Sequence, residues 1–321
     1  MEFSAIMLTM GVSFLLAVIV GPLFIPLLRR LKFGQQIREE GPQAHLKKKG
    51  TPTMGGIIIM LALSLAYFRF GGHRSMEFYI LLVASLGYGL IGFLDDYIKI
   101  VFKRSLGLTA RQKMLGQLIF AVIVCVMLYR IDHNTDLIIP GLDLHIPLGW
   151  LYYPFVILFM MGMSNAVNFT DGLDGLLSGT SAIAFGALTV IAMMGSEHES
   201  AFFSAAMIGA VLGFLVFNAH PAKVFMGDTG SLGIGGGLVA VSLLTKTELL
   251  LVVIGGVFII EILSVIIQVT SFKTTGKRVF KMSPIHHHFE LSGWSEWRVV
   301  ITFWIAALIL AGLGLFLHEG L

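Results

Sequence analysis

Ten apolar runs, separated by mostly short polar connections, recur along this chain. They cover roughly residues 3–28, 54–70, 78–98, 114–130, 149–167, 175–194, 201–217, 231–245, 249–270 and 298–317. A helix needs about 17–25 apolar residues to cross the hydrocarbon core of a bilayer. The runs therefore predict an all-α polytopic membrane protein with about ten transmembrane helices, of which the run 231–245 is short and rich in glycine.

Composition supports the same fold class. Of the 321 residues, 56% are hydrophobic and 13% are charged, whereas soluble domains carry about 25% charged residues. The 37 glycines suit transmembrane helices that pack closely, because small residues let backbones approach each other. No soluble domain or linker is evident, so we expect a single integral membrane domain over residues 1–321.

The distribution of Lys and Arg predicts the orientation, because cytoplasmic loops are enriched in basic residues. Eighteen of the 22 basic residues fall in the connections 29–53, 99–113 and 271–298 and at Lys223. These connections are expected to be cytoplasmic and both termini periplasmic. Segment 131–148, between the fourth and fifth runs, alternates apolar residues around "PG" and predicts a small periplasmic hairpin.

The dense polar motifs all fall on the predicted cytoplasmic side. They are "GPQAHLKKKGTPTMGG", "DDYIK", "NAVNFTDGLDG", "FNAHPAKVFMGDTGS" and "KMSPIHHHFE". Polar residues scattered without function would have no reason to favour one side of the membrane.

Asp95 and Asp96 lie at the predicted cytoplasmic end of the third run. That end is a helix C-terminus, where the partial negative charge disfavours carboxylates by a few tenths to ~1 kcal/mol each. Pairing with Lys99, three and four residues on, is the structural alternative, but one lysine cannot fully relieve two carboxylates. The pair is therefore a candidate for metal binding or proton transfer.

Other acids on this side have a structural explanation too. Thr170 or Asp171 could cap the helix expected over 175–194, with Asp174 in its first turn, and Asp228 and Thr229 could cap the helix expected over 231–245. Yet two acid-bearing helix starts facing the compartment of Asp95 and Asp96 form a pattern that capping does not predict. Helix N-termini also offer cradles for phosphate.

Histidines and an aromatic residue complete the candidate groups. His286, His287 and His288 are adjacent, which does not suit a structural zinc site but suits anion contacts or proton transfer. Phe225, near Asn218, is a candidate stacking surface for a base, with a packing role as the alternative. Glu261 and Gln268, seven residues apart, share a helix face that must point into the bundle or a groove, and we expect them to form hydrogen bonds from helix to helix.

Carboxylates, basic loops and glycine-rich turns beside a membrane point to Mg²⁺-assisted phosphoryl chemistry on an anionic substrate. One substrate could be a lipid. A proton- or cation-coupled transporter is the rival class, but it predicts acids at mid-bilayer depth, and Glu261 alone fits that description.

The motifs "HLKKKGTPTMGG", "LDDYIK", "NAVNFTDGLDGL", "VFMGDTGSL" and "PIHHHFELSGWSE" closely resemble those of the phospho-N-acetylmuramoyl-pentapeptide transferase family. The resemblance spans nearly the whole chain, in the family's order. "TPTMGG" and "PIHHHFE" resemble this branch rather than other transferases that move N-acetylhexosamine 1-phosphate to polyprenyl phosphates. "SEWRVV" departs from the proline that often follows "SE" in the family.

The resemblance implies a Mg²⁺-dependent enzyme of the bacterial inner membrane that acts in peptidoglycan synthesis. UDP-MurNAc-pentapeptide and undecaprenyl phosphate would give lipid I and UMP at the cytoplasmic face. Membrane lipids and a second copy of the chain are the implied partners, with no nucleic acid. Carried over by motif, Asp95, Asp96 and Asp228 are catalytic, and Asp228 and Asp171 bind metal. The substrate-binding residues would be Lys48, Thr53, Asn168, Asp171, Asp174, Asn218, Phe225, His286, His287 and His288.

Overall fold

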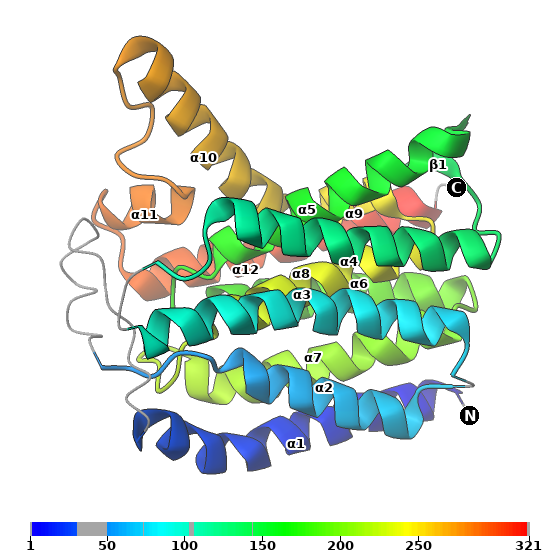
Figure 1. Cartoon of the computed structure of the whole chain (residues 1–321), viewed down its shortest axis with the longest axis horizontal. Helices are drawn as coiled ribbons and strands as arrows, with labels where there is room; N and C mark the ends of the chain where they lie inside the picture. The colour runs from blue at the N-terminus through cyan, green and yellow to red at the C-terminus, as the bar shows by residue number, and fades with distance from the viewer. Residues whose placement is uncertain (1, 31–49, 73, 103–105, 143, 320–321) are drawn as a thin grey trace.

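The computed structural model describes residues 2–30, 50–72, 74–102, 106–142 and 144–319 (Figure 1). The helices are α1 (Glu2–Arg30), α2 (Gly56–Phe70), α3 (Met76–Val101), α4 (Ala110–Arg130), α5 (Tyr152–Thr170), α6 (Leu176–Met194), α7 (His198–Asn218), α8 (Gly227–Leu244), α9 (Glu248–Ile254), α10 (Gly256–Thr275), α11 (Ile285–Glu290) and α12 (Glu296–Glu319). Two strands, β1 (Asp136–Ile139) and β2 (Leu144–Pro147), pair as an antiparallel hairpin, and a 3-10 turn, Gly149–Leu151, precedes α5.

The expected all-α polytopic fold is confirmed, and so is the hairpin between the fourth and fifth runs. Within the described ranges, nine helices are long and apolar enough to cross a membrane. The one expected span that is not among these nine is the second run, 54–70. It forms α2, whose 15 residues are fewer than a full span requires. It begins late because the chain before it is extended: Phe225 N donates to Pro52 O, and Gly55 N donates to Phe225 O.

The glycine-rich run forms the central helix. Helix α8 is packed against α2, α3, α5, α6, α7 and α9, and almost all of its side chains are buried. Helix α3 approaches it so closely that a Cβ placed on Gly92 would lie 2.0 Å from the carbonyl oxygen of Asp228. The glycines lower the hydropathy of the run 231–245, but they also allow α8 to pack closely against its neighbours at the centre of the bundle.

The ninth expected span, 249–270, is broken in two. Helix α9 ends at Ile254 and α10 begins at Gly256, so that α10 leans away from the other helices (Figure 1). The chain then folds back through residues 276–284 to the short helix α11. Glu261 and Gln268, both buried on α10, bind this returning segment: Glu261 Oε2 accepts from Ile285 N at 2.9 Å, and Gln268 Oε1 accepts from Phe280 N at 2.9 Å.

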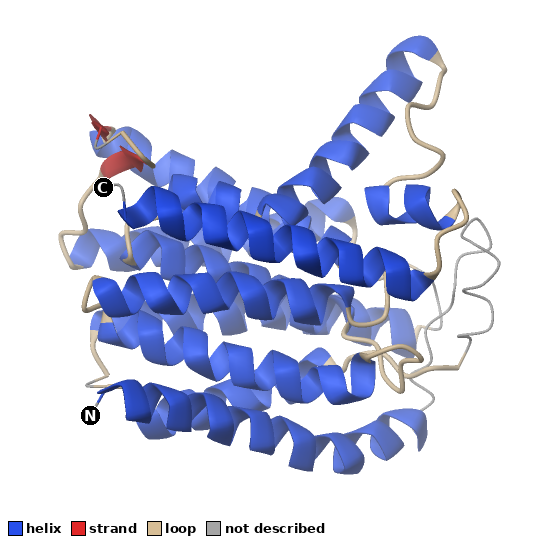
Figure 2. Cartoon of the chain, turned by 180° about the vertical axis from the view of Figure 1, so that it is seen from behind, coloured by secondary structure: helices blue, strands red, loops and turns tan. Residues whose placement is uncertain are grey.

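The helix ends fall into two groups at opposite ends of the bundle. Helix α1 begins and α12 ends at the same end of the bundle in both views, and the end of α12 lies beside the hairpin (Figures 1 and 2). The opposite end gathers the ends of α3, α5 and α7 and the beginnings of α4, α6 and α8. All described parts of the polar motifs singled out in the sequence lie at that second end.

Candidate active site

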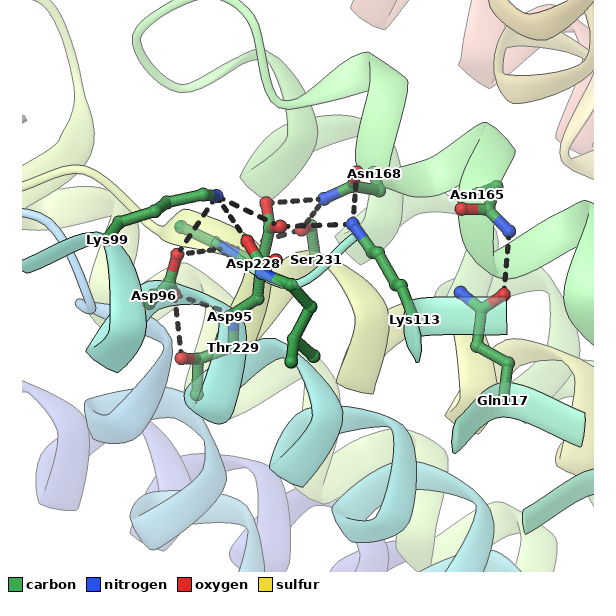
Figure 3. A network of polar contacts seen from close by, with 12 residues as sticks. Asp95, Asp96, Lys99, Lys113, Gln117, Asn165, Asn168, Asp228, Thr229 and Ser231 are labelled. Carbon is green, nitrogen blue, oxygen red and sulfur yellow. Dashed lines mark hydrogen bonds and ion pairs between the residues drawn. The ribbon is translucent and has the colours of Figure 1, made fainter. Parts of the chain in front are cut away.

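Asp95 and Asp96 lie in the last two turns of α3, and both carboxylates pair with Lys99 (Figure 3). Lys99 Nζ is 2.5 Å from Asp95 Oδ2 and 3.7 Å from Asp96 Oδ1. The expected pairing three and four residues along the helix is therefore present. Lys99 is not the only group that stabilises the two carboxylates, because each also accepts hydrogen bonds from other residues.

Asp96 receives its additional hydrogen bonds from the first turn of α8. Its Oδ2 accepts from Thr229 N at 3.0 Å and from Thr229 Oγ1 at 2.8 Å, while its Oδ1 accepts from Asp228 N at 3.3 Å. Amides at the start of a helix have no partner within that helix, and the dipole there favours a negative charge. The carboxylate of Asp96, although it belongs to the C-terminal end of α3, is thus stabilised by the N-terminus of α8. Asp228 itself does not act as the cap of α8.

Asp95 points to a different neighbour. Its Oδ1 accepts from Leu108 N at 2.8 Å, in the connection just before α4. The two adjacent aspartates therefore differ: Asp96 accepts hydrogen bonds from the amide and hydroxyl of Thr229, whereas Asp95 joins Lys99, Asp228 and the α3–α4 connection. One carboxylate oxygen of each of Asp95, Asp96 and Asp228 lies within 4.8 Å of the other two, close enough for the three to hold one metal ion.

Asp228 lies between two lysines and an amide (Figure 3). Its Oδ2 is 3.2 Å from Lys99 Nζ and 3.0 Å from Lys113 Nζ, and its Oδ1 accepts from Asn168 Nδ2 at 3.0 Å. Asn168 also donates to Ser231 Oγ at 2.7 Å. These contacts join α3, α4, α5 and α8 around one carboxylate, and they confirm that residues distant in sequence meet at the acid cluster.

The position of Lys113 is supported from α5. One turn along α4, Gln117 Oε1 accepts from Asn165 Nδ2 at 3.0 Å (Figure 3). Asn165 precedes Asn168 by one turn of α5, and Asn168 Oδ1 accepts from Lys113 Nζ at 3.4 Å, so the two contacts hold α4 against α5. Lys113 is a residue that the sequence reasoning missed. A signal existed, because it lies in the first turn of α4, where the helix dipole disfavours a positive charge.

Asp171 is a half-buried acid just after α5, near enough to Asp228 and Asp96 for their charges to act on it. Burial raises the pKa of its carboxyl well above the ordinary value, and the nearby carboxylates of Asp228 and Asp96 raise it further. A hydrogen bond from the backbone of Gly227 opposes this shift. Asp171 is not a helix cap, since α6 begins after Gly175 and has no side-chain cap.

The remainder of the loop 171–175 is bound to other segments. Asp174 Oδ2 accepts from Ala222 N at 3.0 Å and lies 3.0 Å from His220 Nδ1, and the Asp174 carboxylate is buried. Asn218 Oδ1 accepts from Gly175 N at 3.0 Å, and Asn218 Nδ2 donates to Val224 O at 3.1 Å. Asp174 and Asn218 therefore hold the loop against the chain between α7 and α8.

Thr53 and Phe225 lie at the edge of the cluster. A Cβ on Gly227 would lie 2.7 Å from Asp96 Oδ2 and 2.9 Å from Thr53 Oγ1, so Thr53 is adjacent to the acids. Gly227 has φ +75°, a conformation that favours glycine, and a side chain there would also collide with Asp96. Phe225 is half-buried beside the extended segment that carries Thr53. Lys48 lies outside the described residues.

The three adjacent histidines have three different environments. His286 is fully buried, with Nδ1 3.0 Å from Glu261 Oε1 and with Nε2 against Gly172 of the acid-bearing loop. His287 Nδ1 is 2.7 Å from Glu290 Oε2, and His288 Nδ1 accepts from Lys281 N at 3.1 Å. The triplet therefore does not converge on one point in the described structure, and His286 is the member that touches the loop of Asp171.

Comparison with known proteins identifies the family. Residues 78–246 match the family model of glycosyl transferase family 4. The chain is 60% identical over 316 residues to the phospho-N-acetylmuramoyl-pentapeptide-transferase of Bacillus subtilis (strain 168), with 98% of each chain covered. It is 61% identical over 309 residues to the protein of that name from Geobacillus sp. (strain WCH70), with 95% of each covered. The chain belongs to the phospho-N-acetylmuramoyl-pentapeptide transferase family.

The resemblance expected from the motifs is thus confirmed, and the chain is a transferase with several membrane-spanning helices. The matched region of glycosyl transferase family 4 contains the acids of α3, α8 and the loop 171–175, together with Lys113 and Asn168. The histidine helix α11 lies beyond that region, in the part of the chain matched by full-length members of the phospho-N-acetylmuramoyl-pentapeptide transferase family.

Proposed function

We propose that this chain transfers phospho-MurNAc-pentapeptide from UDP-MurNAc-pentapeptide to undecaprenyl phosphate, giving lipid I and UMP in peptidoglycan synthesis. The name shared by its full-length relatives supports the donor and the group transferred. The observation that carries the proposal is the position of Asp228, bound by Lys99 and Lys113 where the polar helix ends gather. Acids and lysines in contact suit a reaction between two phosphate-bearing substrates.

Magnesium fits the residues present. Four carboxylates, those of Asp95, Asp96, Asp171 and Asp228, share the site with the two ammonium groups of Lys99 and Lys113. If all are ionised, two negative charges remain, which one Mg²⁺ would balance. Carboxylate oxygens are also the ligands that Mg²⁺ prefers. We therefore propose Asp228 and Asp171 as the residues that hold it; when bound, it would neutralise charge on the diphosphate.

The side chains of the cluster suggest a division of tasks. Asp95, which lies beside Asp228 and Lys99, would accept the proton of the lipid phosphate as that phosphate attacks the β-phosphate directly. Lys99 and Lys113 would attract substrate phosphate oxygens, and Asp96 would hold α8 in place. Phe225 would stack on uracil, and the histidine triplet would contact the diphosphate or sugar, with Lys48, Thr53 and Asn168 as further substrate contacts. The site would face the cytoplasm of a bacterial inner membrane, as the basic loops predict.

The test is release of UMP by detergent-solubilised protein. We expect release when UDP-MurNAc-pentapeptide, undecaprenyl phosphate and Mg²⁺ are all present, and none in EDTA. Asp228→Asn should abolish release without unfolding the protein. Folded wild-type protein that released no UMP under these conditions would refute the function, and faster reaction with UDP-N-acetylglucosamine would refute the donor. Release of one UMP per enzyme without the lipid would refute direct attack.

A further inference from the structure

Three segments at the same end of the bundle as the acid cluster meet at a second group of titratable side chains. Asp174 belongs to the loop between α5 and α6, His220 to the connection between α7 and α8, and Glu296 to the start of α12. His220 Nδ1 is 3.0 Å from Asp174 Oδ2 and 3.1 Å from Glu296 Oε2. One atom of each residue that could bind a metal ion lies within 4.8 Å of the corresponding atoms of the other two.

The chemistry of this group decides between a metal site and a hydrogen-bonded clasp. An imidazole nitrogen can ligate a metal only without its proton, whereas a nitrogen between two carboxylates is stabilised by carrying one. The carboxylates are already engaged with the backbone: Asp174 Oδ2 accepts from Ala222 N at 3.0 Å, and Glu296 Oε1 accepts from Asp174 N at 2.8 Å. The arrangement is therefore a clasp in which the Nδ1–H of His220 joins both acids.

Asn218, nearby, joins a different set of segments from His220. Its hydrogen bonds to Gly175, Ser178 and Val224 link the loop 171–175 and α6 to the α7–α8 connection, and these three bonds do not reach α12. His220 adds α12. The ring of Trp297, the residue after Glu296, lies edge-on to the His220 imidazole with centroids 6.3 Å apart, and this contact holds the ring plane.

The clasp bears on the proposed metal ligands. Asp171 precedes Asp174 by three residues in a loop without regular helix, and Asp228 follows His220 by eight residues. The backbone of Gly227 donates to Asp171. The separation of the two acid-bearing segments is therefore set at one side by the Gly227–Asp171 contact and at the other by the clasp. We propose that His220 is a positioning residue, which acts through Asp174 and Glu296 to hold Asp171 at its place opposite Asp228.

This inference rests on the proposed function, so its test combines transferase activity with two readouts that do not need turnover, Mn²⁺ binding and hydrogen exchange. His220→Leu removes the Nδ1–H, and His220→Asn keeps a nitrogen donor near the position of Nδ1. His145→Leu is the matched control, because His145 is also partly exposed and lies 3.9 Å from a carboxylate, Asp136, at the far end of the bundle. The side chain of His220 is 35% exposed, so its removal leaves no sealed cavity.

We expect His220→Leu to weaken Mn²⁺ binding, followed by EPR without substrates, about tenfold and to lower kcat/KM about tenfold, the effect of one charge-assisted hydrogen bond. Hydrogen exchange of the peptide covering 171–176 should accelerate. His220→Asn should restore most of each quantity, and His145→Leu should change none. Unchanged exchange in His220→Leu, or equal losses in His220→Leu and His220→Asn, would overturn the proposal. Loss of Mn²⁺ binding in His220→Leu but not in Asp228→Asn would instead refute the proposed metal ligands.

Discussion

Asp96, near the end of α3, accepts two hydrogen bonds from Thr229 in the first turn of α8, one from the amide at 3.0 Å and one from the hydroxyl at 2.8 Å. This contact joins two helices whose dipoles point in opposite directions along the bundle. A carboxylate that is disfavoured at the end of its own helix is stabilised by the beginning of the neighbouring one. The contact also places Asp228, the residue before Thr229, beside Lys99.

Removing the Asp96 carboxylate should loosen the start of α8. Asp96→Ala leaves the buried donors of Thr229 without an acceptor, and we expect a loss of about 2–3 kcal/mol in the free energy of unfolding. Thr229→Val removes the hydroxyl bond alone and should cost about 1 kcal/mol. Unfolding by SDS in mixed micelles measures both.

The control for Thr229→Val is Thr189→Val, because the Thr189 hydroxyl donates to Phe185 O within its own helix at 2.8 Å. We expect this variant to change stability little. Equal stability of Asp96→Ala and wild type would show that the capping contact does not stabilise the fold.

Lys113 should matter for turnover more than for folding. It is one of two ammonium groups on Asp228 Oδ2, at 3.0 Å, so Lys113→Met would leave Lys99 as the other. We expect kcat/KM to fall at least about tenfold, and Lys113→Arg to retain more activity because the charge is kept. Lys223→Met, at an exposed position of the same end of the bundle, is the control and should leave kcat/KM unchanged. A Lys113→Met enzyme as active as this control would remove Lys113 from the site.

Much of this arrangement could be predicted from the sequence. Apolar runs long enough to span the bilayer predict most of the helices, because each transmembrane helix must satisfy its own backbone groups. The position of Asp95 and Asp96 at a helix C-terminus, where carboxylates are disfavoured, predicts that the site lies there. It does not predict the difference between the two acids, which depends on which of them faces the first turn of α8.

Features that depend on contacts between distant segments could not be predicted. The late start of α2 follows from the backbone pairing of Pro52 and Gly55 with Phe225, more than 150 residues away in sequence. The break between α9 and α10 occurs within an apolar run, where hydropathy gives no signal. The clasp of His220 joins three segments that are brought together by the packing of α6 against α7 and α12, and no spacing in the sequence reports it.

The close approach of α3 to α8 makes Gly92 a sensitive position. A Cβ added to Gly92 would lie 2.0 Å from the Asp228 carbonyl oxygen, a backbone atom that cannot move without shifting α8. We expect Gly92→Ala to cost about 1–3 kcal/mol of stability and to abolish transferase activity, because Asp228 would move relative to Asp95. Gly162→Ala, on α5 with open space around its Cβ, is the matched control for helix propensity and should be tolerated. A fully active Gly92→Ala enzyme would contradict this close packing.

The raised pKa of Asp171 predicts how the metal-free protein responds to pH. Burial and the charges of Asp228 and Asp96 favour the protonated carboxyl in the folded state, while an unfolded aspartate titrates near pH ~4. Stability from this group is therefore fully present below about pH 4 and is lost as the pH rises through the raised folded-state pKa. In EDTA, the melting temperature of Asp171→Asn should exceed that of wild type increasingly as the pH rises through this window. Added Mg²⁺ should reduce the gap by stabilising wild type, whereas parallel melting curves at every pH would show that Asp171 carries no unfavourable charge.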